Sequence, residues 1–182
     1  MAVNDLITQY GLFAIFAGTG IEGEPFAIAG GIVAHHGLLP LWQVILAASI
    51  GSCVVDQFWF FLGRRFRNHK WVVSMSKRAA FADAIDLIER RPTLFILLFR
   101  FAYGLRAIAP VAIGTSRVSV WRFVPLNLLS AALWGPLYVY VGFVFGATLE
   151  QWLPHSASTI VAAVFIVILI SVFGCRAALR RR

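Results

Sequence analysis

The chain is a nearly continuous series of apolar segments separated by short polar and basic stretches. A helix needs about 20 apolar residues to cross the hydrocarbon of a bilayer, whereas a shorter stretch can enter and turn back where protein covers its backbone. We expect four membrane-spanning helices, over residues 6–21, 41–62, 123–146 and 157–175. Two further segments, residues 25–39 and 92–115, are interrupted by Gly and Pro and are predicted to be re-entrant helical hairpins.

The polar stretches between these segments predict the orientation. Residues 64–70, Arg117, Arg122 and the C-terminal tail 176–182 are basic, and Lys and Arg near span ends stay on the cytoplasmic side. Both termini are therefore predicted to be cytoplasmic, which requires segment 92–115 to return to the side it entered. Residues 71–91 place apolar side chains at helical spacing among charged ones and predict an amphipathic helix on the cytoplasmic surface.

A weak internal repeat is also visible. Trp42 precedes Gly63 by the same interval as Trp121 precedes Gly142, and each pair lies on a predicted span that follows a broken apolar segment. Because these spans cross in opposite senses, the pattern is typical of an inverted repeat. Two unrelated spans remain the alternative. The predicted fold is an all-α multi-pass membrane protein with about four spanning helices, two re-entrant hairpins and a cytoplasmic amphipathic helix.

The amino-acid composition also indicates that most of the chain is surrounded by lipid. Of its 182 residues 60% are hydrophobic and only 13% are charged, which is too apolar for an ordinary soluble domain. No linker divides the chain, so we expect a single membrane domain over residues 1–182. The net charge of +8 is explained by membrane topology better than by nucleic-acid binding. Asp5 and the absence of Lys or Arg before the first apolar segment argue against a cleaved signal peptide.

The cysteines and histidines indicate neither a disulfide framework nor a metal centre. Cys53 and Cys175 both lie in apolar segments and share no ligand spacing with the histidines. We find no arrangement of nucleophile and base that would indicate catalysis. We therefore expect no metal, no cofactor and no catalytic residue.

Ionisable residues inside the membrane cost several kcal/mol and usually have a partner or a function. Asp56 precedes the predicted span end at Leu62 by six residues, which places it about 9 Å below the cytoplasmic boundary. The other candidates are Glu22, Glu24, Arg100 and Arg106.

Arg100 and Arg106 lie in the second broken segment, on either side of Gly104 and ahead of Pro110. A hinge at Gly104, helped by Pro110, would turn both guanidinium groups into one cavity. Two arginines in a cavity reached by lipid make a strong phosphate site, because each offers a planar fork of donors that stays charged. A structural role, in which acids only neutralise the arginines, is the alternative.

Polar side chains near these charges have two interpretations. Gln57, Asn127 and Ser130 either extend a polar track or form interhelical hydrogen bonds, and the second interpretation is favoured.

Three blocks of the sequence resemble the DedA family of membrane proteins, which is related to the SNARE-associated or VTT-domain scramblases. Residues 51–64, with Asp56 and then Gly63-Arg64, are similar to the family's Gly-Asp, aromatic, Gly-Arg block. Residues 99–106, followed by Pro110 and Gly114, are similar to its block with two arginines, and Phe123, Asn127 and Trp134 match positions that follow. The block around Glu22 and Glu24 leaves open which glutamate is the family acid. The resemblance covers residues 12–146.

The resemblance implies a bacterial inner-membrane protein that moves polyprenyl phosphate or phospholipid across the bilayer and depends on the proton gradient. It also implies that the acids and arginines named above are needed for function. Our hypothesis is a lipid flippase or scramblase in which Arg100 and Arg106 bind the lipid phosphate. Asp56 with Glu22 or Glu24 would alternate between the arginines and protons.

The expected partners are lipids with anionic phosphate headgroups and protons, with no nucleic acid and with a homo-oligomer left open. A proton-dependent antiporter of small cations or drugs, using the same acids, is the alternative within transport. A lipid-phosphate enzyme and a membrane assembly protein are alternatives of another class. A proton-coupled antiporter would respond to a cation gradient, and an enzyme would release phosphate.

Overall fold

The computed structural model describes residues 3–67, 69–70, 73–74, 85, 88, 90–101, 106 and 108–150, and every regular element in this part of the chain is a helix. The helices are α1 (Val3–Ile21), α2 (Glu24–His35), α3 (Leu41–Arg65), α6 (Pro92–Leu98), the 3₁₀ helix η1 (Phe99–Phe101), α7 (Ala109–Thr115) and α8 (Val120–Glu150). The all-α prediction is confirmed for these residues. The predicted span 157–175, the tail 176–182 and most of the amphipathic segment 71–91 lie outside the described residues.

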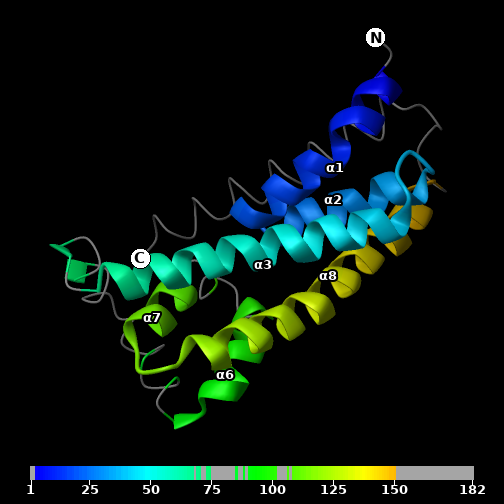
Figure 1. Ribbon diagram of the computed structural model, residues 1–182. Helices are drawn as coiled ribbons and strands as arrows, with labels where there is room; N and C mark the ends of the chain where they lie inside the picture. Colours follow the sequence, from blue (N-terminus) through cyan, green and yellow to red (C-terminus); the bar gives the residue numbers. More distant parts are fainter. Residues whose placement is uncertain are drawn as a thin grey trace, which may run out of the picture. The chain divides into compact units, whose positions relative to one another are not determined.

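The two long helices drawn in Figure 1, α3 and α8, correspond to two of the predicted spans. Within the described residues, both are long and apolar enough to cross a membrane. The residue before each helix accepts one of its first amides: the amide of Val44 donates to the Pro40 carbonyl at 3.2 Å, and that of Phe123 donates to the Ser119 carbonyl at 3.0 Å. The sequence therefore predicts the core of both helices, and the structure extends each by a few residues.

The two Gly- and Pro-interrupted segments form short helices. Gly23 (φ 81°) and Gly37 (φ 71°) adopt the left-handed conformation that favours glycine, and they bracket α2. The second segment breaks into α6, η1 and α7. At 1.5 Å per residue α2 is roughly 18 Å long and α6 and α7 roughly 10 Å each, so none reaches across the ~30 Å hydrocarbon. Their re-entrant placement remains a prediction.

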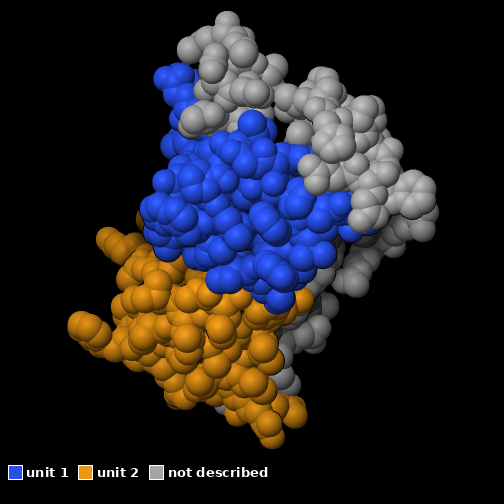
Figure 2. Space-filling view, turned by 90° about the vertical axis from the view of Figure 1, so that its right-hand side faces the viewer, with its two compact units in different colours: residues 1–52, 135–182 blue, residues 53–134 orange. Residues whose placement is uncertain are grey.

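The chain divides into two compact units, coloured separately in Figure 2. Unit 1 comprises residues 1–52 and 135–182, and unit 2 comprises residues 53–134. The boundaries fall inside the long helices, so α3 begins in unit 1 and ends in unit 2, whereas α8 does the reverse. Each unit therefore contains short helices from one half of the sequence and parts of both long helices.

In unit 1 the short helix α2 packs against α8 through two glycines. A Cβ atom on Gly31 would collide with the carbonyl oxygen of Val139, and one on Gly142 would collide with that of Ile28. Only glycine permits this approach of two helix backbones.

In unit 2 the short helix α7 packs against α3 through two glycines of its own. A Cβ atom on Gly114 would collide with the carbonyl oxygen of Phe60, and one on Gly63 would lie 2.6 Å from that of Val111. The buried apolar core of this unit surrounds that contact, and in it the rings of Phe60 and Phe123 stack with their centroids 4.1 Å apart.

The glycine contacts of the two units correspond position by position. Val139 follows Trp121 at the interval at which Phe60 follows Trp42, and the same holds for Gly142 and Gly63. On the short helices, Ile28 precedes Gly31 at the interval at which Val111 precedes Gly114. The two Trp and Gly pairs found in the sequence thus belong to matching sets of contacts.

Candidate functional site

A buried arginine lies in unit 2, in the part of the second broken segment that directly follows α6. Arg100 is the middle residue of η1 and its side chain is fully buried. The hydroxyl of Ser130 on α8 donates to the carbonyl of Leu97 at 2.9 Å, which satisfies one of the carbonyls left without a helical partner as α6 ends. The end of α6 is thereby attached to α8, and this attachment positions Arg100.

The guanidinium of Arg100 forms an ion pair with Asp56 of α3. Arg100 Nη2 lies 2.7 Å from Asp56 Oδ2, and the two side chains are 0% and 4% exposed. Removing two charges from water costs several kcal/mol per ion, and their attraction offsets this only with good geometry and further hydrogen bonds. Burial of this ion pair therefore costs folding free energy.

Asn127 supplies one of the further hydrogen bonds. Arg100 Nη2 donates to Asn127 Oδ1 at 2.6 Å, while Asn127 Nδ2 donates to the carbonyl oxygen of Cys53 at 3.3 Å. The amide thus links η1 to both long helices. Gln57, by contrast, bonds within α3, where its Nε2 donates to Cys53 Sγ at 3.2 Å.

Arg106 has a different environment in the same unit. Its side chain is half-buried, and its guanidinium carbon lies 4.8 Å from the ring centroid of the buried Trp134. A cation over an indole face is attracted by the ring quadrupole, by about 2 kcal/mol where water is excluded. The predicted hinge residue Gly104 lies outside the described residues, and Pro110 lies in the buried first turn of α7.

The candidate glutamates flank the turn between α1 and α2 in unit 1. Glu22 is exposed, whereas Glu24 is the half-buried first residue of α2. The structure thus brings together Asp56 and Arg100 within unit 2, and it places the glutamates in unit 1.

Sequence reasoning missed three contributors to this part of unit 2. Trp134 matches a position of the family block, but the sequence does not predict that it lies against Arg106, where the structure places it. Cys53 contributes its backbone carbonyl, which has no signature in a sequence.

The third is Arg64, which the sequence indicates as a basic residue at a span end and as part of the Gly63-Arg64 block, but whose hydrogen bonds it does not predict. Its guanidinium donates to the carbonyls of Gly114 at 3.4 Å and Ser116 at 3.2 Å, and also to that of Val118. These carbonyls lie at the end of α7 and in the turn after it, where a cation is favourable. The Gly63-Arg64 pairing was the available signal, because glycine admits α7 and arginine bonds its end.

The chemistry open to this site follows from its donors and acceptors. In the part of the chain that is described, no three His, Cys, Asp or Glu side chains lie close enough together to hold a metal ion. The site offers a buried guanidinium shared between a carboxylate and an amide, and a second guanidinium over an aromatic ring. The guanidinium groups can bind anions, and the carboxylate can exchange a proton.

Comparison with known proteins identifies one matching family and several similar proteins. Residues 21–144 match the VTT domain family. The chain is 36% identical to inner membrane protein YohD of Escherichia coli strain K12, over 100% of this chain and 95% of that protein. It is 28% identical to inner membrane protein YabI of the same strain, over 66% of this chain and 48% of that protein.

A third relative is protein DedA of Escherichia coli strain K12, at 26% identity over 78% of this chain and 73% of that protein. No solved structure matches the chain significantly. YohD and YabI are named as inner membrane proteins, and none of the three relatives is named as an enzyme. The family match covers more than half of the chain and includes Asp56, Arg100 and Arg106, so this protein is a membrane protein of the DedA family, the family defined by the VTT domain.

Proposed function

We propose that this protein is an inner-membrane flippase or scramblase that moves a phosphate-bearing lipid, such as undecaprenyl phosphate or a phospholipid, across the bilayer. The observation that carries the proposal is the buried ion pair between Arg100 and Asp56, whose shortest N to O distance is 2.7 Å. Charges of both signs inside a membrane protein mark ion and substrate pathways, because they are too costly to keep otherwise.

Lipid phosphate and Asp56 compete for the same donor. Asp56 Oδ2 lies 2.7 Å from Arg100 Nη2, and a phosphate oxygen would pair with the same guanidinium. Protonation of Asp56 removes its negative charge and releases the guanidinium for the phosphate. Proton binding and lipid binding are thereby linked, which makes the transport proton-coupled.

Arg106 provides the second cation. The face of the Trp134 ring attracts its guanidinium without neutralising the charge. A headgroup bound to Arg100 would also contact the guanidinium of Arg106, and the lipid tail would remain among the acyl chains of the bilayer.

The proposed membrane arrangement uses the correspondence between the two units. In it α3 and α8 cross the bilayer in opposite senses, and α2 and the α6 to α7 segment enter as re-entrant hairpins of an inverted repeat with both termini in the cytoplasm. Discontinuous helices in such repeats form substrate sites near the midplane. Glu22 or Glu24 is the second acid proposed to alternate, like Asp56, between pairing with an arginine and binding a proton.

Liposomes with a tail-labelled fluorescent phosphatidylglycerol test the proposal. The purified chain should carry label from the inner to the outer leaflet, where a membrane-impermeant reductant quenches it, and a pH gradient should change the rate. Arg100→Gln should slow this exchange at least about tenfold, the equivalent of one charge-assisted hydrogen bond. Arg122→Gln is the matched control, because Arg122 is exposed and bonds only Thr93 Oγ1 among the described side chains.

The double variant Asp56→Asn with Arg100→Gln guards against misfolding, since two neutral amides can bond where the ion pair stood. Lipid exchange at the wild-type rate by this folded variant would refute the proposal. Parallel vesicles containing undecaprenyl phosphate identify which lipid is preferred.

A further inference from the structure

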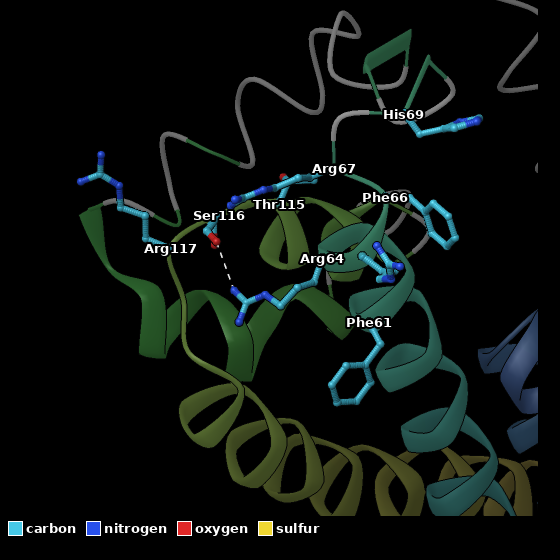
Figure 3. Close-up of a pocket in the computed structure, with 9 residues that line it drawn as sticks. Phe61, Arg64, Phe66, Arg67, His69, Thr115, Ser116 and Arg117 are labelled. Atoms are coloured by element: carbon cyan, nitrogen blue, oxygen red, sulfur yellow. Dashed lines mark hydrogen bonds between the residues drawn. The ribbon is translucent and has the colours of Figure 1, made fainter.

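Unit 2 has an open basic pocket at the end of α3, separate from Asp56, Arg100 and Arg106 (Figure 3). Its volume is about 1400 Å³. It is lined by Phe61, Arg64, Arg65, Phe66, Arg67, His69, Thr115, Ser116 and Arg117. Four of these nine residues are arginines and none is acidic. The lining therefore favours an anion.

The arginines do not all have the same role. Arg64 is occupied by the backbone after α7, and Figure 3 shows its bond to the carbonyl of Ser116. The hydroxyls of Thr115 and Ser116 also donate to α7 carbonyls, at 2.8 and 2.7 Å. These bonds fix the inner wall of the pocket and offset the partial negative charge at the helix end.

The other three arginines are exposed at the pocket. The guanidinium carbon of Arg65 lies 5.9 Å from the ring centroid of Phe66. Arg67 lines the same pocket, and Arg117 extends outward from the turn after α7 (Figure 3). None of the three forms an ion pair with a carboxylate in the described part of the chain. Like charges gathered around one opening repel one another, and a bound anion relieves this repulsion.

Two exposed aromatic rings indicate the kind of anion. Phe61 and Phe66 are 46% and 45% exposed and line the same pocket, at the end of a helix apolar enough to cross a membrane. Exposed rings next to guanidinium groups at a span end are suited to the headgroup region of a bilayer. An amphiphile would place its anionic group against the arginines and its apolar part against the rings.

We infer that this pocket binds a phosphate monoester, either the headgroup of an anionic lipid or a soluble phosphate. A monoester carries a charge of about −1.5 to −2 near neutral pH and three acceptor oxygens, which matches three guanidinium forks better than the single charge of a phosphodiester. The inference goes beyond the proposed transport function and uses none of its residues. Failure of one therefore leaves the other standing.

Native mass spectrometry of the full chain from nanodiscs tests the lipid source. The discs contain phosphatidylcholine with either phosphatidic acid, a monoester, or phosphatidylglycerol, a diester, at equal total charge. The wild type should retain phosphatidic acid at least about tenfold better than the variant Arg65→Gln, Arg67→Gln, Arg117→Gln. A tail variant with Arg176→Gln, Arg180→Gln and Arg181→Gln removes the same charge and should bind like the wild type.

A second variant separates guanidinium geometry from charge. The variant Arg65→Lys, Arg67→Lys, Arg117→Lys keeps the charge but removes the planar guanidinium groups. This variant should bind phosphatidic acid more weakly than the wild type. Equal retention of the two lipids by the wild type, or equal losses in the pocket and tail variants, would overturn the inference.

Titration with inorganic phosphate, followed by ³¹P NMR, tests the soluble source. Broadening that disappears in the glutamine variant supports a soluble monoester. Broadening that persists there, without selective lipid retention, counts against the pocket as a phosphate site. Arg64 is left unchanged throughout, because its bonds hold α7 in place.

Discussion

Breaking the buried ion pair from one side should destabilise the protein far more than replacing both partners. Arg100→Gln would leave the Asp56 carboxylate, which is 4% exposed, without its guanidinium. Removing one partner of a buried pair typically costs about 3–5 kcal/mol. An ordinary interhelical hydrogen bond in a membrane protein contributes only about 0.6 kcal/mol. The measured cost therefore distinguishes a charged pair from neutral polar packing.

The double variant Asp56→Asn with Arg100→Gln completes the comparison. Its two amides carry no charge, and Asn127 still offers an acceptor, as it does to Arg100 at 2.6 Å. We expect the double variant to be more stable than either single variant, with a coupling free energy near 3 kcal/mol.

Reversible unfolding in mixed micelles measures these free energies. The chain has six tryptophans, and Trp134 is buried against Arg106 in the same unit, so tryptophan fluorescence should report loss of this packing. Arg122→Gln, at an exposed residue, should cost less than about 0.5 kcal/mol. A cost below about 1 kcal/mol for Arg100→Gln, or strictly additive single costs, would refute the assignment of the pair as buried and charged.

Four further substitutions test the packing. Gly31→Ala and Gly114→Ala each drive a Cβ into a backbone carbonyl of the same unit. Each should lower the free energy of unfolding by about 1–3 kcal/mol. An unchanged free energy of unfolding in either variant would contradict the contact made by that glycine. Arg64→Gln removes the bonds to the carbonyls that follow α7 and should speed amide exchange over residues 114–118, whereas unchanged exchange would dispute its anchoring role. Ser130→Ala leaves the Leu97 carbonyl without its 2.9 Å donor and should cost about 1 kcal/mol in the same unfolding assay; no loss would imply that water replaces the hydroxyl.

The sequence predicts the long helices well because their physics is local. Continuous apolar runs bounded by Pro40 and by Arg64 place α3 within a few residues of its observed limits. The depth of Asp56 also follows from its position along that helix. The 25–39 and 92–115 segments are predicted as re-entrant helical hairpins. The structure has one short helix, α2, in the first and α6, η1 and α7 in the second, and their placement in a membrane stays a prediction.

The pairing inside the site depends on information that is not local. Arg100 and Arg106 lie on a broken helix, so no helical wheel gives their relative directions. That Asp56 pairs with Arg100, and that Trp134 faces Arg106, follows from how three separate segments pack. The carbonyl of Cys53 could not be anticipated at all, since every residue has one.

Each long helix contributes one half to each unit, and this division constrains the order in which the two units can fold during synthesis. Unit 2 is one uninterrupted stretch, residues 53–134, and all of it has left the ribosome before the second half of α8 appears. Unit 1 needs residues from both ends of the chain, and Gly31 cannot meet Val139 until that late segment is inserted. Closing this long loop is entropically slow. A chain whose synthesis is arrested once residue 134 has left the ribosome would therefore have unit 2 complete, while α2 still lacked its packing partner on α8.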